Sequence, residues 1–128
     1  MVMDCGIVIP AEYWLATSPD RRVFDPCERD PHGIIEVKCP YSLSDKTEEQ
    51  FLAECPYLTC LRKDHHYYYQ IQGQLGITGL SWCDFVLWTK NVIIIQRIPF
   101  DNVFWENEVK TLTDFYFQHY LEYLSELL

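Results

Sequence analysis

Runs of apolar residues in the first third of the chain indicate short β-strands. The clearest run, residues 34–38 (Ile-Ile-Glu-Val-Lys), follows Gly33 and is closed by Pro40. Proline lacks the backbone N–H that a sheet uses, so it is typical of a strand end. Further strands are predicted over residues 5–9 and 13–18, on either side of Pro10, and from Val23 and Phe24 onward.

Two later segments carry helical or mixed patterns. Residues 44–55 predict a helix that Ser44 or Asp45 can cap, with Phe51 and Leu52 on its apolar side. Residues 65–79 are ambiguous. Their tyrosines and isoleucines favour a strand, whereas the spacing of Tyr68, Ile71 and Leu75 fits one face of a helix. As a helix, this segment would be capped by Asp64 and ended by Gly79.

The last third predicts a β-hairpin and a long helix. Strands over residues 82–89 and 92–98 flank Lys90 and Asn91 as the turn. Asp101 can cap a helix that reaches Leu127. Strands, then helix, strands and helix predict an α/β fold with a mixed β-sheet flanked by helices, in a single domain over residues 1–128.

Composition supports a folded domain without a membrane span. Of 128 residues, 48% are apolar and 16% aromatic, and no run approaches the ~18 apolar residues that cross a bilayer. The first residues lack the pattern of a secretory signal, so we expect an intracellular protein (cytoplasm or nucleus), not a secreted one, with reduced cysteines. A zinc site is an open alternative, because histidines lie near Cys27 and Cys60, although only Cys55 and Cys60 form a close pair.

The net charge of −9 argues against a simple nucleic-acid binder, because phosphate binding favours a basic surface. The acids are unevenly distributed, however. From Asp101 onward there are six acids and one base, whereas most bases around the candidate site lie earlier: Arg21, Arg22, Lys38, Arg62 and Lys63.

Two acids and a lysine form the candidate functional site. Glu36 and Lys38 alternate with Ile35 and Val37, so they share one face of a strand, and we expect Ile35 and Val37 to point into the core. Sequential strands usually pair, which brings Asp20 beside them. Such a group can hold a hard divalent cation and position a water for phosphodiester hydrolysis. The same short pattern also fits an exposed Glu–Lys pair on an edge strand, which contributes little.

Four segments extend this pattern: LATSPD at 15–20, GIIEVKCPY at 33–41, YYQIQGQLGITG at 68–79 and WCDFVLW at 82–88. In this order they resemble the YqaJ-like viral recombinase and phage lambda exonuclease family, within the PD-(D/E)xK restriction-endonuclease-like nucleases. The resemblance implies a restriction-endonuclease-like core and favours a helix for residues 65–79.

The resemblance also implies Mg²⁺-dependent cleavage of DNA, typically 5′ to 3′ from the ends of linear duplexes, with Mn²⁺ able to substitute. By position, Asp20 and Glu36 would bind the metal together with the Val37 carbonyl. Lys38 would orient or deprotonate the attacking water and stabilise phosphate charge, and Gln70 would help order the site. A homo-oligomer and a single-strand annealing protein are the partners that the family implies.

Two departures from the family leave a second function open. Arg21 stands where glycine is usual, so its side chain would contact phosphate or crowd the site. The family's amino-terminal helical part, which supplies another glutamate, has no counterpart here, and Glu12 does not match that glutamate. The alternative is a catalytically weak or inactive module that keeps the nuclease fold and binds DNA or protein. Candidate DNA contacts are Arg21, Arg22, Arg62 and Lys63.

Overall fold

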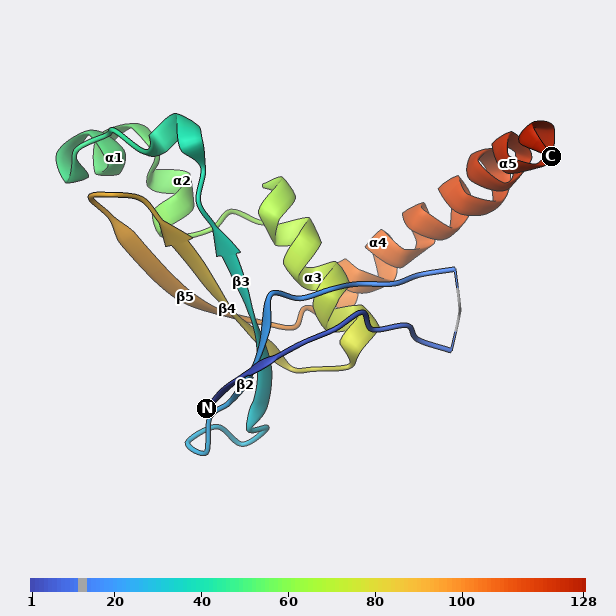
Figure 1. Ribbon diagram of the computed structural model, residues 1–128, viewed down its shortest axis with the longest axis horizontal. Helices are drawn as coiled ribbons and strands as arrows, with labels where there is room; N and C mark the ends of the chain where they lie inside the picture. Colours follow the sequence, from blue (N-terminus) through green and yellow to red (C-terminus); the bar gives the residue numbers. More distant parts are fainter. Residues whose placement is uncertain (12–13) are drawn as a thin grey trace.

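The fold is built on a mixed β-sheet, seen in a computed structural model that describes residues 1–11 and 14–128 (Figure 1). The described residues form five strands, in spatial and chain order alike: β1 (Val2–Asp4), β2 (Arg21–Phe24), β3 (His32–Lys38), β4 (Trp82–Trp88) and β5 (Ile93–Pro99). The pairing of β3 with β4 is parallel, and the other three pairings are antiparallel. The mixed sheet predicted from the order of elements is therefore confirmed.

Helices fill the long connection between the parallel strands and continue after the last strand. Between β3 and β4 lie a 3-10 turn η1 (Tyr41–Leu43) and the helices α1 (Glu48–Glu54), α2 (Pro56–Thr59) and α3 (His66–Thr78). After β5 come α4 (Asn102–Phe115), the π-helical segment η2 (Tyr116–Tyr120) and α5 (Leu121–Leu127). A parallel pair needs such a crossover, because a short turn cannot return the chain to the same end of the sheet.

The hydrophobic core lies between one face of the sheet and helices α1 to α3. The sheet contributes buried side chains from β3, β4 and β5, and the helices and their loops complete the cluster: Ile34, Cys83, Phe85, Leu87 and Ile98 from the sheet; Phe51, Cys55, Leu58, Leu61, Tyr68, Ile71 and Leu75 from the helical side. Burial of these side chains supplies the main stabilisation of the fold.

The face of β3 that points into this core is the opposite of the one expected. Ile34 is fully buried and Glu36 is 3% exposed, whereas Val37 is 40% exposed and Ile35 is only partly buried. The expectation that Ile35 and Val37 point into the core is therefore wrong. The reason is that α3 covers the Glu36 face and brings amide donors with it, so the carboxylate is buried with hydrogen-bond partners rather than in an apolar layer. β3 is also a central strand, so the edge-strand alternative does not apply.

The first strands differ from the prediction. β1 is Val2–Asp4, ahead of the predicted strand 5–9, and it pairs with β2. Val8 and Thr17 form only an isolated antiparallel bridge. The predicted strand 13–18 includes Tyr13, which lies outside the described residues, as does Glu12. Pro10 interrupts this region, which explains why pairing there does not extend.

Side chains cap the starts of α1, α3 and α4, and two of the three predicted capping residues were wrong. Helix α1 begins at Glu48, after a capping box in which Thr47 and Gln50 bond each other's backbone N–H, so neither Ser44 nor Asp45 caps it. Helix α3 is capped by His65, not Asp64. Asp101 does cap α4, by accepting from the Phe104 N–H.

The ambiguous segment is a helix, and it ends as predicted. Gly79 adopts a left-handed conformation with φ of 70° at the end of α3, where a residue with a side chain would be strained. On the same helix, Gly76 lies against Trp105 of α4: a Cβ there would be 2.2 Å from the Trp105 ring. The missing side chain at Gly76 therefore sets how closely α3 and α4 pack.

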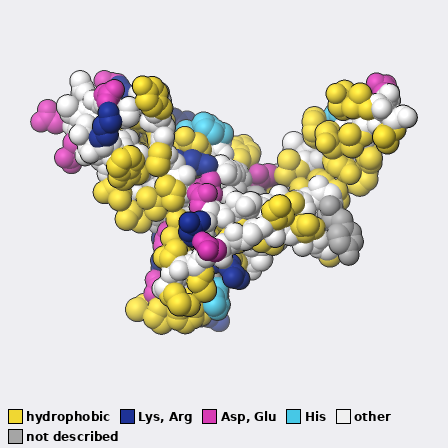
Figure 2. Space-filling view, viewed as in Figure 1, with side chains coloured by type: hydrophobic (Ala, Val, Ile, Leu, Met, Phe, Trp, Pro, Cys, Tyr) yellow, Lys and Arg dark blue, Asp and Glu magenta, His cyan; other side chains and the backbone are white. Residues whose placement is uncertain are grey.

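The helical stretch from α4 to α5 projects from the sheet domain (Figure 1). Hydrophobic side chains cover much of its distal part in Figure 2, and several large ones are exposed: Phe115, Phe117, Tyr120, Tyr123 and Leu127. Trp14 packs against Tyr116 and Phe117. None of the helices formed by described residues combines the length and the apolar composition of a membrane span.

Candidate active site

Asp20 reaches β3 through a side-chain contact with the backbone. Its Oδ2 accepts a 2.7 Å hydrogen bond from the Val37 N–H, and the preceding Pro19 is fully buried, which anchors this turn. Pairing of β2 with β3 stops at Arg21 and Ile35, so Val37 lies past the end of β2. Because the N–H and C=O of one strand residue point to the same side, the Val37 carbonyl faces the side on which Asp20 lies.

Glu36 is the centre of the hydrogen-bond network. Its Oε1 accepts from Lys38 Nζ at 2.6 Å and from Gln70 Nε2 at 2.7 Å. Its Oε2 accepts from Gln74 Nε2 at 2.8 Å. Three donors, one of them charged, therefore satisfy both oxygens of this buried carboxylate.

Lys38 is held from three sides. Besides Glu36, its ammonium donates to Gln70 Oε1 at 2.7 Å and lies 5.2 Å from the centre of the Tyr67 ring. Glu36, Lys38 and Gln70 thus form a closed triangle of hydrogen bonds. An ammonium has three N–H donors, and two are used here, so one can still serve a phosphate oxygen or a water.

The interior beside the site is closed to solvent at Cys83. Cys83 on β4 is fully buried, and burial, followed by the nearby Glu36 charge, raises the pKa of its thiol well above the usual range. In such surroundings charge–charge interactions are stronger than in water. The network around Glu36 is therefore expected to respond strongly to any change of charge.

The donors at this site fit a magnesium ion. No three His, Cys, Asp or Glu side chains among residues 1–11 and 14–128 lie close enough to hold a metal by themselves. That finding gives no support to the zinc alternative. Mg²⁺, however, prefers hard oxygen ligands and commonly takes only one or two carboxylates, completing its shell with water and phosphate oxygens. Asp20, Glu36 and the Val37 carbonyl supply this chemistry.

The four predicted DNA contacts are placed differently. Arg21 donates to the backbone carbonyl of Asp20 at 2.7 Å, next to the site, and its Nε is 3.5 Å from Asp4. Arg22, also on β2, lines a separate cavity with His32.

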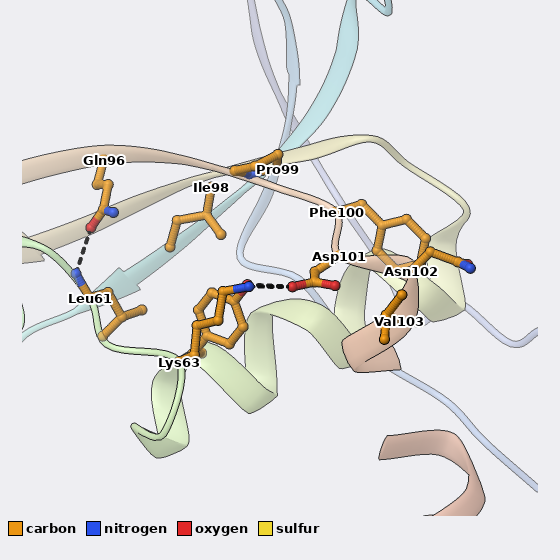
Figure 3. Close-up of a pocket in the computed structure, with 10 residues that line it drawn as sticks. Leu61, Lys63, Gln96, Ile98, Pro99, Phe100, Asp101, Asn102 and Val103 are labelled. Carbon is orange, nitrogen blue, oxygen red and sulfur yellow. Dashed lines mark hydrogen bonds and ion pairs between the residues drawn. The ribbon is translucent and has the colours of Figure 1, made fainter. Parts of the chain in front are cut away.

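Arg62 and Lys63, like Arg21, are each paired with an acid. Arg62 binds Asp64 through two hydrogen bonds. Lys63 points across a pocket to Asp101, 2.6 Å away, at the start of α4 (Figure 3). A DNA phosphate would compete with these carboxylates for Arg62 and Lys63, whereas Arg21 lies directly beside Asp20.

One residue of the hydrogen-bond network around Glu36, Gln74, was not predicted from the sequence. Gln74 lies one turn after Gln70 on α3, and both donate to Glu36. The signal in the sequence was their i, i+4 spacing, which places both amides on one face of a helix. That signal has meaning only once the segment is known to be a helix packed on the Glu36 face.

Comparison with solved structures defines the class of fold. The chain is similar to an alkaline exonuclease, LHK-Exo, from Laribacter hongkongensis, with 26% identity and a TM-score of 0.65. It is also similar to LHK-Exo in complex with dAMP, with 24% identity and a TM-score of 0.62. In both, the match covers 98% of this chain and 61% of the other, so this chain spans less than two thirds of those proteins. The fold is thus restriction-endonuclease-like.

A family model identifies the group more closely. The model of the YqaJ-like viral recombinase domain matches residues 2–81, from β1 to just beyond α3. This range holds Asp20, Glu36, Lys38 and Gln70. The chain belongs to this family. No curated protein matched the chain in sequence.

Proposed function

We propose that this chain is a metal-dependent deoxyribonuclease domain that hydrolyses phosphodiester bonds at the ends of linear duplex DNA, with 5′-to-3′ polarity. The observation that carries the proposal is the hydrogen-bonded group formed by Glu36, Lys38 and Gln70. The Asp20 carboxylate joins this group by accepting a hydrogen bond from the Val37 N–H, between Glu36 and Lys38. Membership of the YqaJ-like family and similarity to an alkaline exonuclease support this reading.

The residues would divide the work as follows. Asp20, Glu36 and the Val37 carbonyl would hold Mg²⁺ or Mn²⁺, which supplies positive charge to the phosphate and makes a nearby water more acidic. Lys38 would use its third N–H to orient the attacking water or to stabilise charge on the phosphate. Gln70 holds Lys38 and Glu36 at a constant spacing, because its amide bonds both.

The proposal includes basic residues that would contact the DNA backbone, and partner proteins. Arg21 lies beside Asp20 and is the best placed of the basic residues to meet a phosphate, and Arg22, Arg62 and Lys63 would add contacts along the backbone. Bound cations would offset the net charge of −9 near the site. A homo-oligomer and a single-strand annealing partner, both implied by the family resemblance, stay predictions.

A cleavage assay with matched lysine variants tests the proposal. Linear duplex DNA labelled at the 5′ or the 3′ end is incubated with the chain and Mg²⁺, Mn²⁺ or EDTA. Lys38→Ala is compared with Lys90→Ala, because Lys90 is an exposed lysine that pairs with Asp45 outside the network. Metal-dependent degradation that is lost in Lys38→Ala and kept in Lys90→Ala is the expected result. Early release of the 5′ label would agree with the proposed polarity.

A second candidate, a DNA- or protein-binding module with little or no turnover, is favoured by Arg21, which lies beside Asp20 at the position where the family usually has glycine. Folded protein that binds duplex DNA without cleaving it in either metal would overturn the nuclease proposal in favour of this module. Equal cleavage by Lys38→Ala and the unchanged chain would contradict the site itself.

A further inference from the structure

The two oxygens of the Glu36 carboxylate have different hydrogen-bond partners. Oε1 is held by Lys38 and by Gln70, which is exposed. Oε2 is held by Gln74, which is 3% exposed. The bond between Glu36 and Gln74 is thus the interior contact of the network, and its two side chains are both almost completely buried.

Gln74 is bonded at one end only. Its Nε2 donates to Glu36, while its Oε1 is buried and has no hydrogen-bond partner among the described residues. A buried acceptor without a partner destabilises a fold. The orientation of this amide is therefore governed by the carboxylate, which needs a donor, and not by the surroundings of the amide oxygen.

Gln72, two residues earlier on α3, shows the contrasting case. It is fully buried, its Nε2 donates to the Pro99 carbonyl at 3.0 Å and its Oε1 accepts from the Asp101 N–H at 2.8 Å. Both ends of this amide are satisfied, and both join α3 to the junction of β5 and α4. Gln72 therefore serves the fold, and its hydrogen bonds to described residues go to Pro99 and Asp101, not to Glu36.

We infer that Gln74 is a positioning residue for the metal site. It holds Glu36 Oε2 from the interior, so that the carboxylate keeps its orientation when a divalent cation competes with Lys38 and Gln70 for it. This inference rests on the proposed function of Glu36 as a metal ligand. Partners of this kind, which orient a ligand without touching the metal, typically change metal affinity 10–100-fold.

Calorimetric titration of the full chain with Mn²⁺ tests the inference, with four proteins compared: the unchanged chain, Gln74→Met, Gln72→Met and Glu36→Gln. Methionine keeps most of the volume and removes the amide. We expect Gln74→Met to weaken Mn²⁺ binding about 10–100-fold. We expect Gln72→Met to bind Mn²⁺ as the unchanged chain does but to unfold at a lower urea concentration. Glu36→Gln should abolish binding.

The outcomes separate the two ideas. If Glu36→Gln abolishes binding and Gln74→Met does not weaken it, the positioning role is overturned and the metal site stands. If Glu36→Gln binds Mn²⁺ like the unchanged chain, or the unchanged chain binds none, the proposed metal site fails and the positioning role fails with it. Equal loss of affinity in Gln72→Met and Gln74→Met would show a general packing effect and overturn the specific role.

A measurement on the unchanged protein covers the case in which Gln74→Met does not fold. In a ¹⁵N-labelled sample titrated with Mg²⁺, the side-chain amide signal of Gln74 should shift, and that of Gln72 should stay in place. A Gln74 signal that does not respond, while the backbone amide of Val37 does, would contradict the inference without affecting the metal site.

Discussion

The carboxylate of Asp20 is tied to the backbone N–H of Val37 by a hydrogen bond of 2.7 Å. This bond joins the turn before β2 to the end of β3, beyond the point where the two strands pair. It holds the Asp20 carboxylate at the backbone of the residue that follows Glu36. Asp20 therefore has a structural role that is separate from its proposed role as a metal ligand.

Two substitutions at Asp20 should separate these roles. Asp20→Asn keeps an oxygen that accepts from Val37, so its free energy of unfolding should stay within about 0.5 kcal/mol of the unchanged chain. Asp20→Ala removes the bond and should cost about 1 kcal/mol, measured by urea unfolding without metal. Both should lose the rise in Tm that Mn²⁺ gives by binding the folded state. An Asp20→Asn protein that Mn²⁺ stabilises fully would show that the charge is not needed.

Gly76 should tolerate no side chain. A Cβ there would lie 2.2 Å from the Trp105 ring, so α3 and α4 would have to separate. We expect Gly76→Ala to cost about 2 kcal/mol or more by urea unfolding, despite the better helix propensity of alanine. Gly73→Ala is the matched control on the same helix, since its nearest neighbour is the flexible carboxylate end of Glu108 at 3.3 Å. A larger loss in Gly73→Ala than in Gly76→Ala would contradict this packing.

Glu108 should make the fold less stable as pH rises. Burial raises the pKa of its carboxyl from 4.5 to about 7, and its Oε2 has no partner in the described chain. Between these two values the folded state binds more protons than the unfolded state, so stability falls with increasing pH in this window and levels off above it. Glu108→Gln should remove the effect and gain about 1–3 kcal/mol at pH 8, with little change at pH 4. The prediction would be refuted if the free energy of unfolding, measured with urea, changed with pH by the same amount in both proteins across this range.

His65 should have the opposite pH dependence. Burial, and then the neighbouring His66, lowers the pKa of its imidazole, while Asp64 opposes the shift. Its Nδ1 accepts from the Tyr67 N–H at the start of α3, which requires the neutral ring. The unfolded state therefore binds more protons just below pH 6.5, so this cap stabilises the fold above that pH and is lost on acidification.

Replacement of His65 by asparagine tests this dependence. Asparagine caps helices without titrating, so His65→Asn should lose part of the fall in stability between pH 7 and pH 5. Hydrogen exchange at the amide of Tyr67 provides a local measurement: its protection factor, the intrinsic exchange rate divided by the observed rate, should fall on acidification in the unchanged chain and fall less in His65→Asn. Identical acid dependence in both proteins would assign the effect to other groups.

Much of the fold could be predicted where local chemistry decides it. The hairpin around Lys90 and Asn91, the cap at Asp101 and the left-handed end at Gly79 follow from turn and capping preferences, and the structure confirms them. The predicted start of α1, capped by Ser44 or Asp45, was wrong. The helix begins after Thr47 instead, because Thr47 and Gln50 each bond the other's backbone N–H.

The structure brings several of the predicted site residues together and adds Gln74, which was not predicted from the sequence. The structure links Asp20 to Val37 and Glu36 to Lys38 and Gln70 by direct hydrogen bonds, while their catalytic roles stay predictions. The prediction of which face of β3 points into the core was wrong. A period-2 pattern shows which side chains share a face of a strand, but not which of the two faces a helix will cover.

Residue order and spacing alone determined the mixed sheet, the family resemblance and the set of candidate side chains, since alternation, caps and motif spacing act over a few neighbouring residues. Only the tertiary structure decided that Glu36 is buried, that Gln74 contacts it from 38 residues away, and that Lys63 faces Asp101. These contacts join segments far apart in the chain, and they depend on how α3 packs on β3 and β4. The sequence pattern of each segment carries no record of that packing.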